Sequence, residues 1–171
     1  MGINKIFNCF LQDTITIDPG RNTGIAVWDG NACPWTYEIN TPKKYTGISM
    51  LSYLHSQFYL ILSQFVSLKK AIIEGVDFRE DSLVSRTAAV RGDLSILSYV
   101  VGTYVALLRE NNSEMDIRIL TAREWKGNLT KEATTTRVRL INGLTYTSDH
   151  ITDAVAIGFS QTKLWRLGCD K

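Results

Sequence analysis

The sequence predicts a mixed α/β fold whose sheet begins as a hairpin meander. Three short β-type runs follow one another before any helical pattern occurs, and later apolar runs alternate with segments of helical periodicity. Hydrophobic residues make up 44% of the 171-residue chain, which is ordinary for a globular domain and sufficient for a large core. We therefore expect one domain over residues 1–171, with residues 1–12 as an N-terminal extension.

The first half of the chain supplies most of the expected sheet. The first three strands are expected at residues 14–18, 23–28 and 35–39. Asp29-Gly30-Asn31 provides turn chemistry between the last two. Apolar residues then recur at helical spacing over residues 48–66, and residues 70–76 contain the apolar run of a buried strand.

The second half is predicted to be mainly helical. A long helix over residues 83–110 carries two apolar stripes, which predicts that both the sheet and a partner subunit cover it. Gly92 and Gly102 within it are attributed to close packing. The remaining elements are expected to be a strand at residues 117–120, a helix at 131–142 stopped by Gly143, and a last helix that begins near Ser148.

Composition narrows the class of protein. No apolar run approaches the ~20 residues that span a bilayer, so no membrane segment is expected, and the N-terminus lacks the pattern of a signal peptide. The three cysteines, Cys9, Cys33 and Cys169, are widely scattered. This spacing argues against a disulfide framework or a zinc site and favours a reducing compartment, the cytoplasm.

Positive charge is concentrated in one region. Between residues 117 and 139, six basic residues stand against two acidic ones, a local balance of +4 in a chain whose net charge is +2. The basic residues are Arg118, Arg123, Lys126, Lys131, Arg137 and Arg139. Such a stripe suits a phosphate backbone, although a solvated helix face explains such runs equally well.

Two carboxylates end predicted strands. Asp18 closes the first β-type run directly before Pro19-Gly20, and Glu74 closes the central apolar run. Taken singly, Asp-Pro-Gly is ordinary turn chemistry and a terminal Glu is an ordinary strand end. Together they place two acids where strands end, which is where a catalytic metal site is commonly built.

A third stretch adds to this pair. If Ser148 caps the last helix, His150 and Asp153 share one helical face. Asp149 has a structural explanation, because an acid in the first turn favours the helix dipole, and His150 has one as a capping or surface residue. Asp153 lies within an Ala/Val/Ile segment, where an ionised carboxylate needs a cation.

Acids from three separate parts of a chain suit one kind of chemistry. Mg²⁺ prefers oxygen ligands and is often shared between carboxylates and substrate phosphates. Two such ions ~4 Å apart activate water and stabilise the leaving 3′ oxygen when a phosphodiester is hydrolysed.

These motifs, in this order, resemble the RuvC family of Holliday junction resolvases, within the ribonuclease H-like nucleases. The matching pieces are Ile17-Asp18-Pro19-Gly20 with Thr23-Gly24, Ile72-Ile73-Glu74, and His150-Ile151-Thr152-Asp153-Ala154-Val155-Ala156-Ile157. Residues 86–92 resemble the start of the family's long second helix, and residues 122–127 with Lys131 resemble its basic connection. The likeness extends from Thr14 to Ser160, and it is the ordered set that is specific.

The resemblance implies a ribonuclease H-like sheet, a three-strand antiparallel meander plus two parallel strands, flanked by helices. It implies that the catalytic and metal-binding residues are Asp18, Glu74, His150 and Asp153, holding two Mg²⁺ or Mn²⁺ ions. Many relatives carry Asp at the position of His150 and others carry His, so His150 fits the family pattern, while Asp149 remains a rival ligand. Relatives also wedge an aromatic residue into the junction, and Phe78 stands one residue out of register with that position.

The resulting hypothesis is a homodimeric endonuclease that resolves four-way DNA junctions, of viral or bacterial type. Its DNA-binding residues would be Arg123, Lys126, Lys131, Arg137, Arg139 and Phe78. The alternatives are a related nuclease acting on RNA–DNA hybrids, flaps or packaged phage DNA, and a junction-binding protein without catalysis. An actin-like ATPase would need a second Asp-x-Gly turn in a duplicated domain, and this chain has neither.

Overall fold

The computed structural model describes residues 10–76, 87 and 92–167. Its strands are β1 (Gln12–Asp18), β2 (Asn22–Asp29), β3 (Trp35–Asn40), β4 (Lys70–Glu74) and β5 (Asp116–Leu120). Its helices are α1 (Gly47–Leu62), α3 (Asp93–Asn111), α4 (Ala122–Lys126), α5 (Lys131–Asn142), α6 (Asp149–Ser160) and α7 (Lys163–Leu167). The strands form one sheet in the order β3-β2-β1-β4-β5. β1 to β3 are antiparallel, and β4 is parallel to both β1 and β5, which confirms the predicted mixed sheet.

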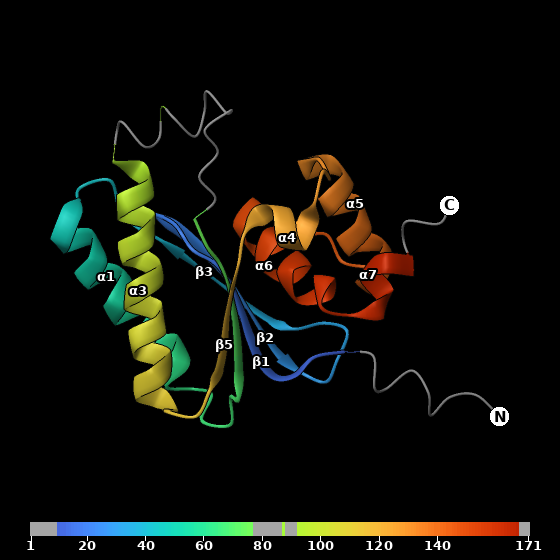
Figure 1. Ribbon diagram of the computed structural model, residues 1–171, viewed down its shortest axis with the longest axis horizontal. Coiled ribbons are helices and arrows are strands. Elements are labelled where there is room, and N and C mark those ends of the chain that lie inside the picture. The colour runs from blue at the N-terminus through green and yellow to red at the C-terminus, as the bar shows by residue number, and fades with distance from the viewer. Residues whose placement is uncertain (1–9, 77–86, 88–91, 168–171) are drawn as a thin grey trace.

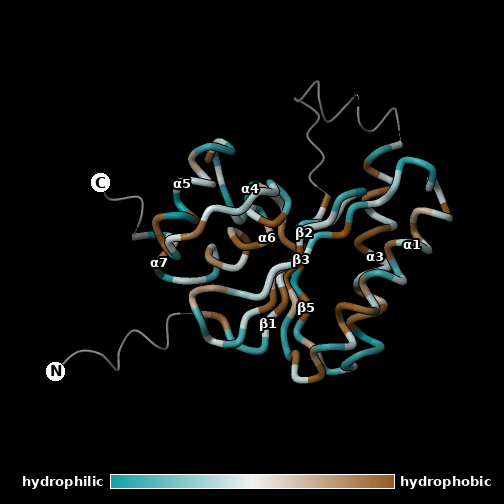
Figure 2. Tube along the Cα trace, turned by 180° about the vertical axis from the view of Figure 1, so that it is seen from behind, coloured by the Kyte–Doolittle hydropathy of each residue, from teal (hydrophilic) through white to brown (hydrophobic). Residues whose placement is uncertain are grey.

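Helices cover both faces of this sheet. α1 and α3 lie on one face, and α4 to α7 gather on the other (Figure 1). Side chains alternate between the two faces along each strand. Ile15 and Ile17 of β1 therefore join the core under α1 and α3, whereas Ala26 and Trp28 of β2 join the core under α6. Figure 2 shows the hydrophobic residues concentrated in the sheet and recurring along α3.

α6 is attached to the sheet through Thr16. The buried Thr16 hydroxyl donates to the carbonyl of Ala154 in α6 at 2.7 Å and accepts from the indole Nε1 of Trp28 at 3.0 Å. Gly158 of α6 lies against the Trp28 ring so closely that a Cβ there would overlap the indole. These contacts set the position of α6 along β1 and β2.

The structure corrects several sequence-based boundaries. α1 ends at Leu62 rather than at Val66, because residues 63–64 form a turn. α4 and α7 were not predicted, since five residues are too few to show a helical period. α4 nevertheless has a local signal, because Thr121 and Glu124 form a capping box.

The long helix also differs from expectation. α3 begins at Asp93, and the predicted residues 83–91 lie outside the described part of the chain except for Thr87. Gly92 is the N-cap at φ 78°, a left-handed conformation that favours glycine, and Gly102 has open space around it, so close packing explains neither.

Residues from both predicted apolar stripes of this helix are buried in the same hydrophobic core. Val100 and Leu107, expected on a second face, are buried with Val101, Tyr104 and Leu108 beneath α3. Ile96 and Tyr99 of the same helix remain exposed. No helix in the described residues is both long enough and apolar enough to cross a membrane.

Candidate functional site

Two of the predicted acids leave the sheet at the same edge. Asp18 ends β1 and Glu74 ends β4, and these strands are parallel neighbours with Ile17 opposite Ile73. The carboxyl ends of adjacent parallel strands meet at one edge, so the two side chains lie close together. The Asp18 side chain is only 15% exposed, and Glu74 is partly buried.

α6 brings the other two predicted residues to this edge. His150 Nδ1 lies 2.9 Å from Asp18 Oδ2, across 132 residues of sequence. This hydrogen bond is the main reason that the pKa of His150 is raised, and the nearby charges of Glu38 and Asp153 act in the same direction. Asp153 lies one helical turn further along and is partly buried. The predicted pairing of His150 and Asp153 on one helical face therefore places both near Asp18.

A row of three residues across the sheet determines how closely α6 approaches. Gly24 of β2 pairs with Asp18 on one side and with Glu38 of β3 on the other. The backbone of His150 passes directly over Gly24, where a Cβ would overlap its carbonyl oxygen. The hydroxyl of Ser148, the N-cap of α6, donates to Glu38. The first turn of α6 is thus held by a carboxylate on each side of a glycine, and Glu38 is a participant that sequence reasoning missed.

The carboxylates at this edge perturb one another. Burial raises the pKa of Glu74 to about 7, and the negative charges of Asp18 and Asp153 contribute to the shift. Burial, and then the charge of Asp18, raise the pKa of Asp153 to about 6. Lys126 partly opposes both shifts. Clustered carboxylates with raised pKa values are characteristic of a site that binds a cation or transfers protons.

The donor set fits a hard divalent ion, because three carboxylates and one imidazole converge at one edge of the sheet. As the side chains lie, no three His, Cys, Asp or Glu residues within the described ranges are gathered closely enough to enclose an ion. The fit therefore rests on the chemistry of Asp18, Glu74, Asp153 and His150 and on their mutual electrostatics.

Trp125 of α4 contacts this cluster and was not predicted as a site residue. Its indole Nε1 donates to Glu74 Oε2 at 2.9 Å. The Lys126 ammonium lies over the same ring, 5.1 Å from its centroid. The only sequence signal was the position of Trp125 next to a predicted DNA-binding lysine in the basic segment.

Asp149, the rival to His150, points elsewhere. Its carboxylate forms an ion pair with Lys131 of α5, and its side chain is 62% exposed. The structure thus places the imidazole of His150, and not the carboxylate of Asp149, against Asp18.

Apart from Lys126, which lies over the Trp125 ring, the predicted DNA-binding residues fall into three groups. Arg123 and Arg139 are exposed. Lys131 is paired with Asp149, and Arg137 packs 5.0 Å from the ring centroid of Trp165, whose carbonyl it contacts at 3.4 Å. Arg137 of α5 therefore has a structural role, because it joins α5 to Trp165 of α7. Phe78 lies outside the described residues.

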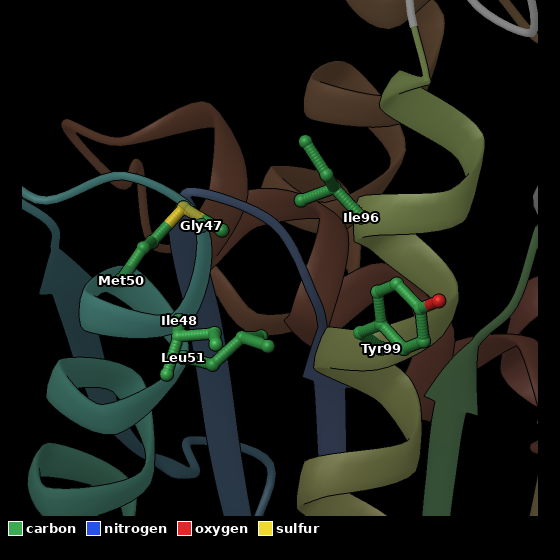
Figure 3. A pocket seen from close by; sticks show the side chains of 6 residues that line it. All are labelled: Gly47, Ile48, Met50, Leu51, Ile96 and Tyr99. Carbon is green, nitrogen blue, oxygen red and sulfur yellow. The ribbon is translucent and has the colours of Figure 1, made fainter.

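An apolar pocket of about 400 Å³ lies away from these carboxylates, between the first turns of α1 and α3 (Figure 3). Its lining residues are Gly47, Ile48, Met50, Leu51, Ile96 and Tyr99. None of these can ligate a hard metal ion or transfer a proton near neutral pH. The pocket is therefore a hydrophobic surface feature, separated from α6 by the sheet.

No family model matches this chain, and no curated protein matches it in sequence. Solved structures match it in three dimensions. The T. thermophilus RuvC in complex with Holliday junction substrate superposes with a TM-score of 0.66 at 15% identity, covering 92% of this chain and 96% of that one. A second Thermus thermophilus RuvC structure gives 0.63 at 18% identity, with coverages of 91% and 96%. The chain therefore has the RuvC fold that its ordered motifs predicted, over nearly its whole length.

Proposed function

We propose that this chain is a structure-selective endodeoxyribonuclease that resolves four-way DNA junctions by paired nicks. One observation carries the proposal: Asp18, Glu74, Asp153 and His150 come from three distant parts of the sequence and converge at one edge of a RuvC-type sheet. The similar T. thermophilus protein was solved with a Holliday junction substrate, which supports branched DNA as the substrate class.

The carboxylates would hold the metal, and His150 would serve the attacking water. Asp18, Glu74 and Asp153 are the proposed ligands of one or two Mg²⁺ or Mn²⁺ ions, which when bound activate water and stabilise the leaving oxygen. Asp18 accepts from Nδ1 of His150 and so orients the ring. His150 thereby presents Nε2, either as a ligand or as the base that takes a proton from water.

The basic residues beside the carboxylates would hold phosphates. Lys126 carries its charge toward Glu74 and Asp153, and Arg123 and Arg139 are exposed on the same layer of helices. Contacts of this kind position a backbone without reading bases, so structure selectivity is expected with little sequence readout from these residues.

A homodimer would supply two sites for paired nicks. The hydrophobic pocket between α1 and α3, with the exposed residues Ile48 and Tyr99 at its rim, is the surface we assign to the dimer contact (Figure 3). Large exposed apolar side chains in one patch are typical of protein–protein interfaces.

The test is cleavage of a labelled four-way junction in Mg²⁺ or Mn²⁺, beside an RNA–DNA hybrid, a flap and a plain duplex. We expect symmetric nicks in the junction, lost in Glu74→Gln and retained in Glu114→Gln, which changes an exposed turn carboxylate. Preferred cleavage of the hybrid or flap would favour the alternative nuclease. Tight junction binding without nicking would indicate a non-catalytic binding protein.

A further inference from the structure

We propose that Trp125 is a positioning residue for Glu74, because its indole N–H fixes one oxygen of that carboxylate so that the other faces the metal. The inference rests on the proposed function, since it assigns a purpose to Glu74 as a ligand. It concerns the tryptophan next to Lys126 in the basic segment, whose role the sequence left open.

The geometry of the contact is well defined. Nε1 of Trp125 lies 2.9 Å from Oε2 of Glu74, and the Trp125 side chain is almost fully buried, with 3% exposure. A buried indole N–H needs an acceptor, and a carboxylate oxygen is a strong one. The hydrogen bond therefore holds both partners in one arrangement.

Neighbouring backbone makes this arrangement rigid. Leu120, the last residue of β5, pairs with Glu74, and its carbonyl accepts from the amide of Gly75 at 2.8 Å. The chain then turns into α4, whose start is fixed by the capping box of Thr121 and Glu124. Because α4 begins shortly after Leu120, the strand neighbour of Glu74, its residue Trp125 lies within hydrogen-bonding distance of the Glu74 carboxylate.

The indole ring also places a cation. The ammonium of Lys126 lies over the ring face, 5.1 Å from the centroid, and its charge acts on both Glu74 and Asp153. Trp125 therefore orients the Glu74 carboxylate with its indole N–H and the Lys126 ammonium with the face of its ring. Groups that orient metal ligands in this way typically contribute 10- to 100-fold to metal affinity.

The experiment uses the indole ¹⁵N–H signals of the full chain, which has four tryptophans. The signals are assigned through the backbone and followed during Mg²⁺ titration. We expect the Trp125 signal to move with Mg²⁺ in the wild type and to stay still in Glu74→Gln. Trp28 is the internal control, because its N–H bonds to Thr16 and its signal should not respond to Mg²⁺.

Trp125→Phe removes the N–H and keeps an aromatic ring. By calorimetry we expect Mg²⁺ to bind this variant roughly tenfold or more weakly, with the Trp28 signal unchanged as evidence of an intact fold. If Mg²⁺ binds Trp125→Phe as tightly as it binds the wild type, the inference is wrong while the proposed function stands. If the wild type binds no Mg²⁺, both fail. If Trp125→Phe does not fold, the Trp125 indole signal decides the matter. The inference is overturned if that signal still moves with Mg²⁺ in Glu74→Gln, or if it does not move in the wild type.

Discussion

The carbonyl oxygen of His150 lies directly over Gly24, in space that the Cβ of any other residue would occupy. Gly24 stands between Asp18 and Glu38 in the sheet, so this approach delivers the first turn of α6 to both carboxylates. His150 reaches Asp18, and Ser148 reaches Glu38. The candidate site therefore depends on glycine at position 24, because any larger residue would keep α6 from approaching the sheet.

Gly24→Ala is expected to destabilise the protein and to separate His150 from Asp18. Overlap with a helix backbone that cannot yield without moving α6 should cost about 1–3 kcal/mol, measured by chemical denaturation. Gly102→Ala is the matched control, because Gly102 lies in α3 with open space around it. That change should raise stability by ~0.5–1 kcal/mol. Equal stability of Gly24→Ala and the wild type would contradict the close approach.

Without metal, stability should fall as pH rises from about 4.5 to about 7. The pKa of Glu74 is raised to about 7 and that of Asp153 to about 6, so the folded protein binds more protons than the unfolded chain in this window. The pKa of His150 is also raised, so stability should keep falling as the pH rises above the ordinary pKa of histidine. The loss should amount to roughly 1–3 kcal/mol between about pH 4.5 and about pH 7, measured by denaturation across this range.

Mg²⁺ should reverse this loss, because its ligands must be deprotonated, and its stabilising effect should be larger at about pH 8 than at about pH 5. Glu74→Gln should flatten much of the slope in the metal-free protein. A metal-free stability that rises through this range would show that the carboxylates are not coupled as described.

His150 and Asp149 should respond differently to substitution. His150→Ala is expected to lower the rate of junction cleavage by ~10²–10⁴-fold, because it removes the imidazole that Asp18 orients toward the attacking water. Asp149→Asn breaks only an exposed ion pair with Lys131, so cleavage should stay within about an order of magnitude of the wild type. Single-turnover rates measure both. The reverse ranking would make Asp149 the ligand.

Binding to a four-way junction should weaken steeply with salt, in proportion to the phosphates contacted. Arg123→Gln and Arg139→Gln should each reduce the slope of log affinity against log salt by ~1. Arg109→Gln is the control, because that guanidinium donates to the carbonyl of Ser113 beyond the end of α3. Fluorescence anisotropy at several salt concentrations gives the slopes.

Arg137→Gln should instead lower stability, since its guanidinium packs on Trp165. We expect a cost of about 1 kcal/mol by chemical denaturation, because a partly buried cation–π contact is lost. A loss of junction affinity with unchanged stability would return Arg137 to the DNA-binding group.

Local patterns in the sequence predicted most elements of the fold. The five strands and the helix stopped by Gly143 follow from alternation, helical period and turn chemistry, and Ser148 is the N-cap of α6 as expected. The elements that the sequence did not predict correctly also have local causes. α4 and α7 are too short to show a period, and α1 ends at Leu62 although apolar residues at helical spacing continue to Phe65.

The order of acids along the chain predicted four residues of the candidate site, Asp18, Glu74, His150 and Asp153, because strand ends and helix faces can be read from short windows. Only the tertiary structure decided how those residues meet. It selected His150 over Asp149 against Asp18, paired Glu74 with Trp125 across 51 residues, and made Gly24 the place where α6 crosses the sheet. The physical reason is that periodicity describes each segment by itself, whereas contacts between segments depend on strand register and on the space left between backbones.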